Sequence, residues 1–181
     1  ETFCANGSRC AALLLKRKGV IGQKANFLSG DGRHEAEIDD SGTAWIKMNP
    51  PIYKTGWLEV CGFSGRHVDS GAKHFACETN SLNYKLVEKS GPEIRYDELF
   101  APTGINVNFF HRITTDRIEV ITYEKGIEKV MLSCGSGAVA AVYHAAQISK
   151  ITSPLKIETP GGCLFLRFDT DWQGVWLGGP A

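Results

Sequence analysis

The sequence lacks the features that would indicate a nucleic-acid or membrane partner. Twenty Lys and Arg residues balance twenty Asp and Glu residues, so the formal net charge is zero. The longest basic cluster is Lys16-Arg17-Lys18, which is too short to predict a surface for nucleic acid or anionic lipid. No apolar run is long enough to span a bilayer, and no signal peptide is recognisable. We therefore expect a soluble protein that binds a small molecule, and neither nucleic acid nor a membrane.

Cysteine pairs with metal-ligand spacing are also missing. The six cysteines, at positions 4, 10, 61, 77, 134 and 163, form no C-x-x-C pair, so we expect no structural zinc site and no other cofactor. A chain of 181 residues, 43% of them hydrophobic, can bury a core without disulfides. The sequence therefore predicts reduced thiols in a cytoplasmic protein.

A cysteine does stand at the start of a helical pattern. An apolar, strand-like run ends at Cys134, and Gly135, Ser136 and Gly137 then lead into a small, apolar helical segment. The unpaired N–H groups and the dipole of a first helical turn favour an anion, so they favour the thiolate of Cys134 and could hold a substrate carboxylate. Taken alone, this segment is also compatible with a buried structural cysteine.

The front of the sequence repeats this plan. Cys4 follows an apolar residue and precedes Ala5-Asn6-Gly7, after which a second helix begins. Two copies predict a duplicated domain with both thiols in one cleft. A thiolate can remove a proton from a carbon while a thiol returns one to the opposite face. The predicted chemistry is stereoinversion without a cofactor.

The rest of the pattern predicts an α+β fold of many short strands around one helix per half. The first helix should run from about Asn6 to Lys18, and Pro92 should open a short helix to Phe100 after a turn at 90–92. The predicted strands are 25–29, 34–38, 43–48, two within 66–76, 105–110, 117–123, 156–159, 163–167 and 174–177.

We expect two pseudo-symmetric domains, residues 1–62 and 63–181. About seventy strand-rich residues precede Cys134, whereas three residues precede Cys4. The expectation is therefore that the N-terminal part of the first domain lies outside this sequence.

Five segments in order make the chain resemble the diaminopimelate epimerase family. They are Phe3–Cys10, Asp69–Phe75, Gly104–Phe109, Tyr123–Gly126 with Leu132–Gly137, and Glu158–Gly162. The resemblance implies two similar domains, each a barrel-like sheet around a central helix, with the active site between them. It also implies a two-cysteine isomerase that needs no pyridoxal phosphate and acts in lysine and cell-wall synthesis.

The resemblance further implies a role for individual residues. Cys4 and Cys134 would be the acid/base pair, and His74 would stand beside the catalytic site. Substrate-binding groups would come from backbone N–H groups and from polar side chains at Ala5, Asn6, Ala72, Asn106, Glu124, Lys125, Gly135 and Ser136.

Three departures from the family pattern keep alternatives open. Ala5 stands where the family has Gly, Lys125 stands where it commonly has Arg, and Ala72-Lys73 replaces a turn that commonly carries Pro. A proline or hydroxyproline racemase-like epimerase, or a catalytically impaired homologue, are the alternatives. The Asn106 side chain could also do no more than hydrogen-bond the backbone of a turn, and Glu124-Lys125 could be a solvated turn. A homodimer is compatible with the sequence.

Overall fold

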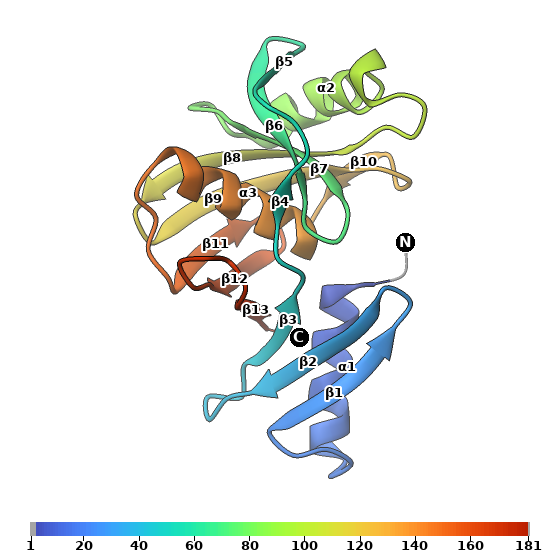
Figure 1. Cartoon of the computed structure of the whole chain (residues 1–181), viewed down its shortest axis with the longest axis vertical. Helices are drawn as coiled ribbons and strands as arrows, with labels where there is room; N and C mark the ends of the chain where they lie inside the picture. Colours follow the sequence, from blue (N-terminus) through green and yellow to red (C-terminus); the bar gives the residue numbers. More distant parts are fainter. Residues whose placement is uncertain (1–2, 181) are drawn as a thin grey trace.

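The structure is a computed structural model that describes residues 3–180. Helices α1 (Ala5–Arg17), α2 (Tyr84–Arg95) and α3 (Gly135–Ile148) and a 3-10 turn, η1 (Glu98–Phe100), accompany one large mixed sheet (Figure 1). The strands are β1 (Lys24–Ser29), β2 (Gly32–Ile38), β3 (Ala44–Met48), β4 (Ile52–Tyr53), β5 (Leu58–Val60), β6 (Phe63–Asp69), β7 (Lys73–Glu78), β8 (Asn106–Thr114), β9 (Arg117–Glu124), β10 (Lys129–Met131), β11 (Leu155–Thr159), β12 (Gly162–Arg167) and β13 (Val175–Gly179). The predicted α+β class is confirmed.

The sheet runs continuously from one half of the chain to the other. Its order is β1-β2-β3-β13-β12-β11-β9-β8-β7-β6-β4, with β10 on β9 and β5 on β6. The join is the antiparallel pair β3 and β13, in which Trp45 lies opposite Gly178. A Cβ on Gly178 would lie 2.5 Å from the Trp45 ring, so this close pairing requires glycine.

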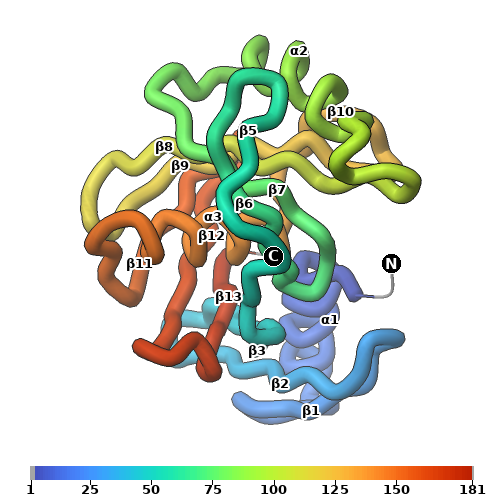
Figure 2. Tube along the Cα trace, turned by 45° about the horizontal axis from the view of Figure 1, so that its top comes forward, coloured from blue at the N-terminus to red at the C-terminus, as the bar shows by residue number. Residues whose placement is uncertain are grey.

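The two helices that follow the cysteines are covered to different extents. Helix α3 has nine buried residues, mostly Gly, Ala and Val, which let β6, β7, β8 and β9 pack closely against it. Helix α1 has three buried residues, Ala5, Arg9 and Ala12. Figure 2 shows α1 beside β1 and β2 at one end of the molecule, with α2 at the other.

Most of the predicted elements are confirmed, but the turn at 90–92 and the helix predicted from Pro92 to Phe100 are wrong. Helix α2 continues through Gly91 and Pro92. Asn83 caps it, since the Asn83 Oδ1 accepts a hydrogen bond of 3.0 Å from the Leu86 N–H. Gly91 packs against the Tyr123 ring, where a Cβ would lie 2.6 Å from Tyr123 atoms. Tertiary packing therefore overrides the turn propensity of the Gly-Pro pair.

The division into residues 1–62 and 63–181 stays a prediction. The chain crosses that point inside the β5–β6 hairpin, at Cys61 and Gly62, which both have positive φ. Because β3 pairs with β13, the sheet does not stop at the predicted boundary.

Candidate active site

Two cysteines take the same position at the start of two helices. Cys4 is the N-cap of α1, with φ −128° and ψ 103°. Cys134 is the N-cap of α3, with φ −132° and ψ 112°. The backbone before each helix is thus nearly identical, which is what a duplicated cysteine-capped helix requires.

Both cysteines line one small cavity of about 100 Å³. The first turns of α1 and α3 meet there, since a Cβ on Gly135 would lie 2.9 Å from the Ala5 Cβ. Eight of the residues proposed from the sequence line the cavity: Cys4, Ala5, Asn6, Asn106, Glu124, Cys134, Gly135 and Ser136. Phe3, Met48 and Ser133 also line it and were missed by sequence reasoning. Phe3 and Ser133 directly precede the two cysteines, and this position is the sequence signal that could have predicted them.

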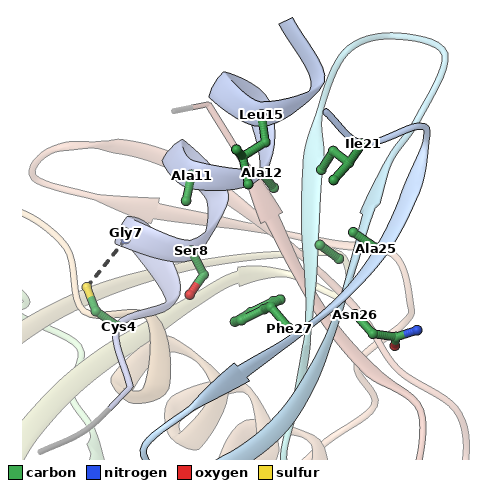
Figure 3. Close-up of a pocket in the computed structure, with 11 residues that line it drawn as sticks. Cys4, Gly7, Ser8, Ala11, Ala12, Leu15, Ile21, Ala25, Asn26 and Phe27 are labelled. Atoms are coloured by element: carbon green, nitrogen blue, oxygen red, sulfur yellow. Dashed lines mark hydrogen bonds between the residues drawn. The ribbon is translucent and has the colours of Figure 1, made fainter. Parts of the chain in front are cut away.

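The surroundings of Cys4 are open. Its Sγ accepts a hydrogen bond of 3.4 Å from the Gly7 N–H, as an N-cap side chain does. Cys4 also borders a second, apolar cavity of about 360 Å³ between α1 and the first hairpin, lined by Ala11, Leu15 and Phe27 among others (Figure 3). The Cys4 sulfur therefore lies between a polar cleft and an apolar one.

Cys134 is partly buried, and its surroundings are polar. Its Sγ lies 3.7 Å from the Ser136 Oγ, and that oxygen lies 2.9 Å from the His74 Nε2. The Ser70 hydroxyl donates a hydrogen bond of 2.7 Å to the Ser136 carbonyl. His74 is fully buried, and this burial lowers its pKa from 6.5 to about 3, so its imidazole is neutral. His74 thus lies behind Ser136 rather than in the cavity.

Asn106 lines the cavity and also fixes the backbone around it. Its Nδ2 donates to the Lys73 carbonyl and its Oδ1 accepts from the Lys125 N–H, both at 2.9 Å. The side chain is 3% exposed. The backbone role that the sequence left open is therefore present, and it links the start of β7 to the end of β9.

Two proposed substrate-binding residues do not line the cavity. The Ala72 carbonyl accepts a hydrogen bond of 3.2 Å from the Ser70 N–H within a turn. Lys125 meets the site through its backbone N–H, which Asn106 holds. Contact of the Lys125 side chain with substrate stays a prediction.

Within residues 3–180, no group of three or more His, Cys, Asp or Glu side chains is arranged to bind a metal ion. Over the same residues, no helix combines the length and apolar character needed to cross a bilayer.

Comparisons with known proteins find diaminopimelate epimerases. The family model for diaminopimelate epimerase matches residues 66–180. The diaminopimelate epimerase of Chlorobaculum tepidum is 31% identical over 99% of this chain and 72% of its own length. That of Thermotoga maritima is 36% identical over 91% of this chain and 66% of its own length. This chain thus spans about two thirds of these relatives.

Solved structures share the fold at low sequence identity. A phenazine biosynthesis protein of the PhzF family from Bacillus anthracis superposes with a TM-score of 0.69 at 9% identity, covering 97% of this chain and 71% of its own. A hydroxyproline epimerase from Agrobacterium vitis, with bound trans-4-hydroxy-L-proline, gives 0.64 at 17% identity, covering 99% and 64%. These structures show the shared fold, while the matching family model and the relatives of 31% and 36% identity establish that the chain belongs to the diaminopimelate epimerase family.

Proposed function

We propose that this chain is a diaminopimelate epimerase, an isomerase that interconverts the LL and meso forms by proton transfer at one α-carbon. The observation that carries the proposal is that Cys4 and Cys134, each capping a helix, line one cavity. Relatives named diaminopimelate epimerase, 31% and 36% identical, support the substrate assignment. This reaction would supply the synthesis of lysine and peptidoglycan.

The two facing helix starts provide a place for the substrate carboxylate. N–H groups of the first turns, at Ala5 and Asn6 and at Gly135 and Ser136, have no partner within their own helix. A carboxylate held between them would be stabilised by both helix dipoles. Because those N–H groups also stabilise the negative charge that develops when the α-carbon loses its proton, they lower the barrier as well as orient the substrate.

Proton transfer then needs one thiolate and one thiol. The thiolate takes the α-proton, and the C–H electron pair is delocalised into the carboxylate. The opposite thiol gives its proton to the other face of the carbon, so that the two sulfurs have exchanged protonation states at the end. No electron is gained or lost, and no further reactant is needed.

The test is hydrogen exchange at the α-carbon in deuterated water. With the full-length protein, LL-diaminopimelate and its meso isomer should each gain one deuterium as they interconvert, followed by mass spectrometry and chiral chromatography. Turnover of proline or trans-4-hydroxyproline with no turnover of diaminopimelate would replace the proposal by the racemase-like alternative. That alternative is favoured by the likeness to the hydroxyproline epimerase structure.

Lys125 offers a second way to separate the alternatives. If Lys125 binds a substrate carboxylate, Lys125→Ala should weaken substrate binding by about 1.5–3 kcal/mol, while Lys125→Arg should preserve it. Lys129→Ala is the matched control, since Lys129 is an exposed lysine on the neighbouring strand β10. Titration calorimetry with a substrate analogue measures all three. Equal binding by the parent and the Lys125→Ala protein would remove Lys125 from the site.

Location and assembly complete the proposal. The reaction needs both cysteines in the reduced form, which is the condition of a reducing cytoplasm. A homodimer is the assembly we propose to test, by light scattering over a range of protein concentrations.

A further inference from the structure

A line of buried polar side chains leads from the core to Cys134. The Thr122 Oγ1 lies 2.9 Å from the Asn108 Oδ1, and the Asn108 Nδ2 lies 2.9 Å from the His74 Nδ1. The His74 Nε2 lies 2.9 Å from the Ser136 Oγ, which lies 3.7 Å from the Cys134 Sγ. Asn108 and His74 are fully buried and Thr122 is 3% exposed. The line joins β9, β8, β7 and α3.

The chemistry of each group sets the direction of every hydrogen bond in the line. The Asn108 Nδ2 also contacts the Phe75 carbonyl at 3.4 Å, and a carbonyl can only accept. The amide therefore presents its nitrogen to β7 and its oxygen to the Thr122 hydroxyl, which donates to it. Since the amide nitrogen donates to the His74 Nδ1, that ring nitrogen accepts.

An imidazole that accepts at Nδ1 carries its single proton on Nε2. Burial of His74 lowers its pKa to about 3, which keeps the ring neutral. The Nε2–H donates to the Ser136 Oγ, so the hydroxyl hydrogen of Ser136 is left to point at the Cys134 Sγ. A hydroxyl directed at a sulfur stabilises the thiolate form more than the thiol form.

Gly137 makes room for this arrangement. A Cβ at position 137 would lie 2.2 Å from the Asn108 Oδ1 and 3.1 Å from the Thr122 Oγ1. The second glycine after Cys134 is therefore required by the polar line as well as by the helix start.

We propose that Thr122 and Asn108 are positioning residues, which hold His74 as the Nε2-protonated tautomer and so keep the Ser136 hydroxyl directed at the Cys134 sulfur. His74 then acts as a fixed hydrogen-bond donor and does not exchange protons with the substrate. Glu124 and Cys4 share the cavity with Cys134, and His67 is the titratable neighbour of His74. The tautomer and the state of Cys134 do not depend on the substrate; only the catalytic consequence rests on the proposed function.

The tautomer is read directly by ¹⁵N NMR of the histidine side chains in the unmodified protein. His74 should give the signature of a neutral ring protonated at Nε2 throughout the neutral pH range, and its signals are assigned by their loss in His74→Gln. A ring protonated at Nδ1, or at both nitrogens, would overturn the proposal whatever the activity of the enzyme.

Alkylation by iodoacetamide reports the thiolate of each cysteine separately, because the thiolate is the reactive form. At neutral pH, Ser136→Ala should slow alkylation of Cys134 about tenfold, as loss of a hydrogen bond to a charged group does. Cys4 is the internal control and should react at an unchanged rate, while Ser136→Thr should restore the rate at Cys134. Equal rates at Cys134 in the parent and Ser136→Ala proteins would contradict the proposal.

Thr122 tests the far end of the line. Thr122→Val keeps the branched side chain and removes the hydroxyl, so alkylation of Cys134 should slow about threefold while thermal unfolding confirms a folded protein. Thr122→Ser keeps the hydroxyl and should behave as the parent. Since Thr122 does not line the cavity, kcat for diaminopimelate should fall with KM unchanged. A change in KM alone would mean that Thr122 acts on substrate binding and would overturn the positioning role.

These readouts separate the two proposals. A protein with the Nε2 tautomer and the alkylation pattern but no action on diaminopimelate would contradict the proposed function only. An active epimerase with the wrong tautomer would contradict the positioning role only.

Discussion

The two cysteine-capped helices have nearly the same backbone conformation at their N-caps, but the two helices are packed differently. The caps at Cys4 and Cys134 differ by 4° in φ and 9° in ψ, from −128° and 103° to −132° and 112°. Yet α3 is enclosed by the sheet, whereas α1 leaves Leu14 53% and Leu15 39% exposed. The comparison teaches that the short cysteine motif determines the cap geometry, while tertiary packing determines what lies behind each sulfur.

The largest expected effect comes from removing either sulfur. Cys4→Ala and Cys134→Ala should each reduce epimerisation by at least about 10³-fold, because a one-base site cannot return a proton to the opposite face. Cys163→Ala is the control, since Cys163 does not line the cavity. Chiral chromatography of diaminopimelate measures the rates. Near-normal turnover by either variant would refute the two-base mechanism and with it the functional equivalence of the two caps.

The next largest effect concerns the residue after each cysteine, where Ala5 carries a methyl group and Gly135 does not. Gly135→Ala should reduce activity by about 10–100-fold, since its Cβ would lie 2.9 Å from both the Ala5 Cβ and the Leu177 Cδ2. Ala5→Gly removes one of those contacts and should leave activity equal or higher. The double variant should recover part of the loss, which a double-mutant cycle measures. Additive effects would show that the two positions do not meet in solution.

The next effect is a loss of stability in acid, which should originate in the half of the chain that contains β7 and α3. His74 and His144 lie on β7 and α3, and burial lowers the pKa of the first to about 3 and of the second to about 4. Below pH 6.5 the unfolded chain binds protons that these folded residues do not, so stability falls as the pH decreases toward those values. Each histidine contributes about 1.4 kcal/mol per pH unit.

Urea unfolding between pH 7 and pH 4 measures this dependence. His144→Gln keeps a hydrogen-bonding partner for Tyr53, which lies 2.7 Å from the His144 Nδ1, and should reduce the slope. Hydrogen exchange should show α3 losing protection before α1. An unchanged slope in the variant would mean that His144 is protonated over the same pH range in the folded and in the unfolded chain, and that burial does not lower its pKa.

The smallest effect tests the exposed face of α1. Leu14→Ala should change the free energy of unfolding by less than about 0.5 kcal/mol, because the side chain is half exposed. Val139→Ala on α3, where the side chain is fully buried, should cost about 2 kcal/mol. Thermal or urea unfolding compares them. A loss at Leu14 as large as that at Val139 would show that α1 is covered in solution.

Periodicity and turn residues predicted the elements that local sequence determines. The strands of the β1–β2 hairpin and the end of α1 near Gly19, with φ +69°, match the patterns that predicted them. Strands β4, β5 and β10 were not predicted, since two or three residues carry no period. Helix α2 was misread at Gly91 because its packing on Tyr123 comes from a distant strand.

The site was predictable where its residues lie beside the cysteines. Ala5, Asn6, Gly135 and Ser136 directly follow a cap, so the motif itself brings them to the cavity. Asn108 and Thr122 were not found, because buried polar residues inside strands resemble any polar residue in an alternating pattern. Their significance depends on the registers of β7, β8 and β9, which place Asn108 opposite both Ala76 and Thr122.

The pairing of β3 with β13 also has a consequence for how the molecule is made. Trp45 and Gly178, which face each other in that pair, lie far apart in the sequence, and such long-range contacts form slowly. During synthesis on the ribosome, β13 emerges after every other described strand. The Cys4 thiol, which stays exposed in the folded protein, is therefore translated long before Cys134 and the strands that bring both sulfurs to one cavity.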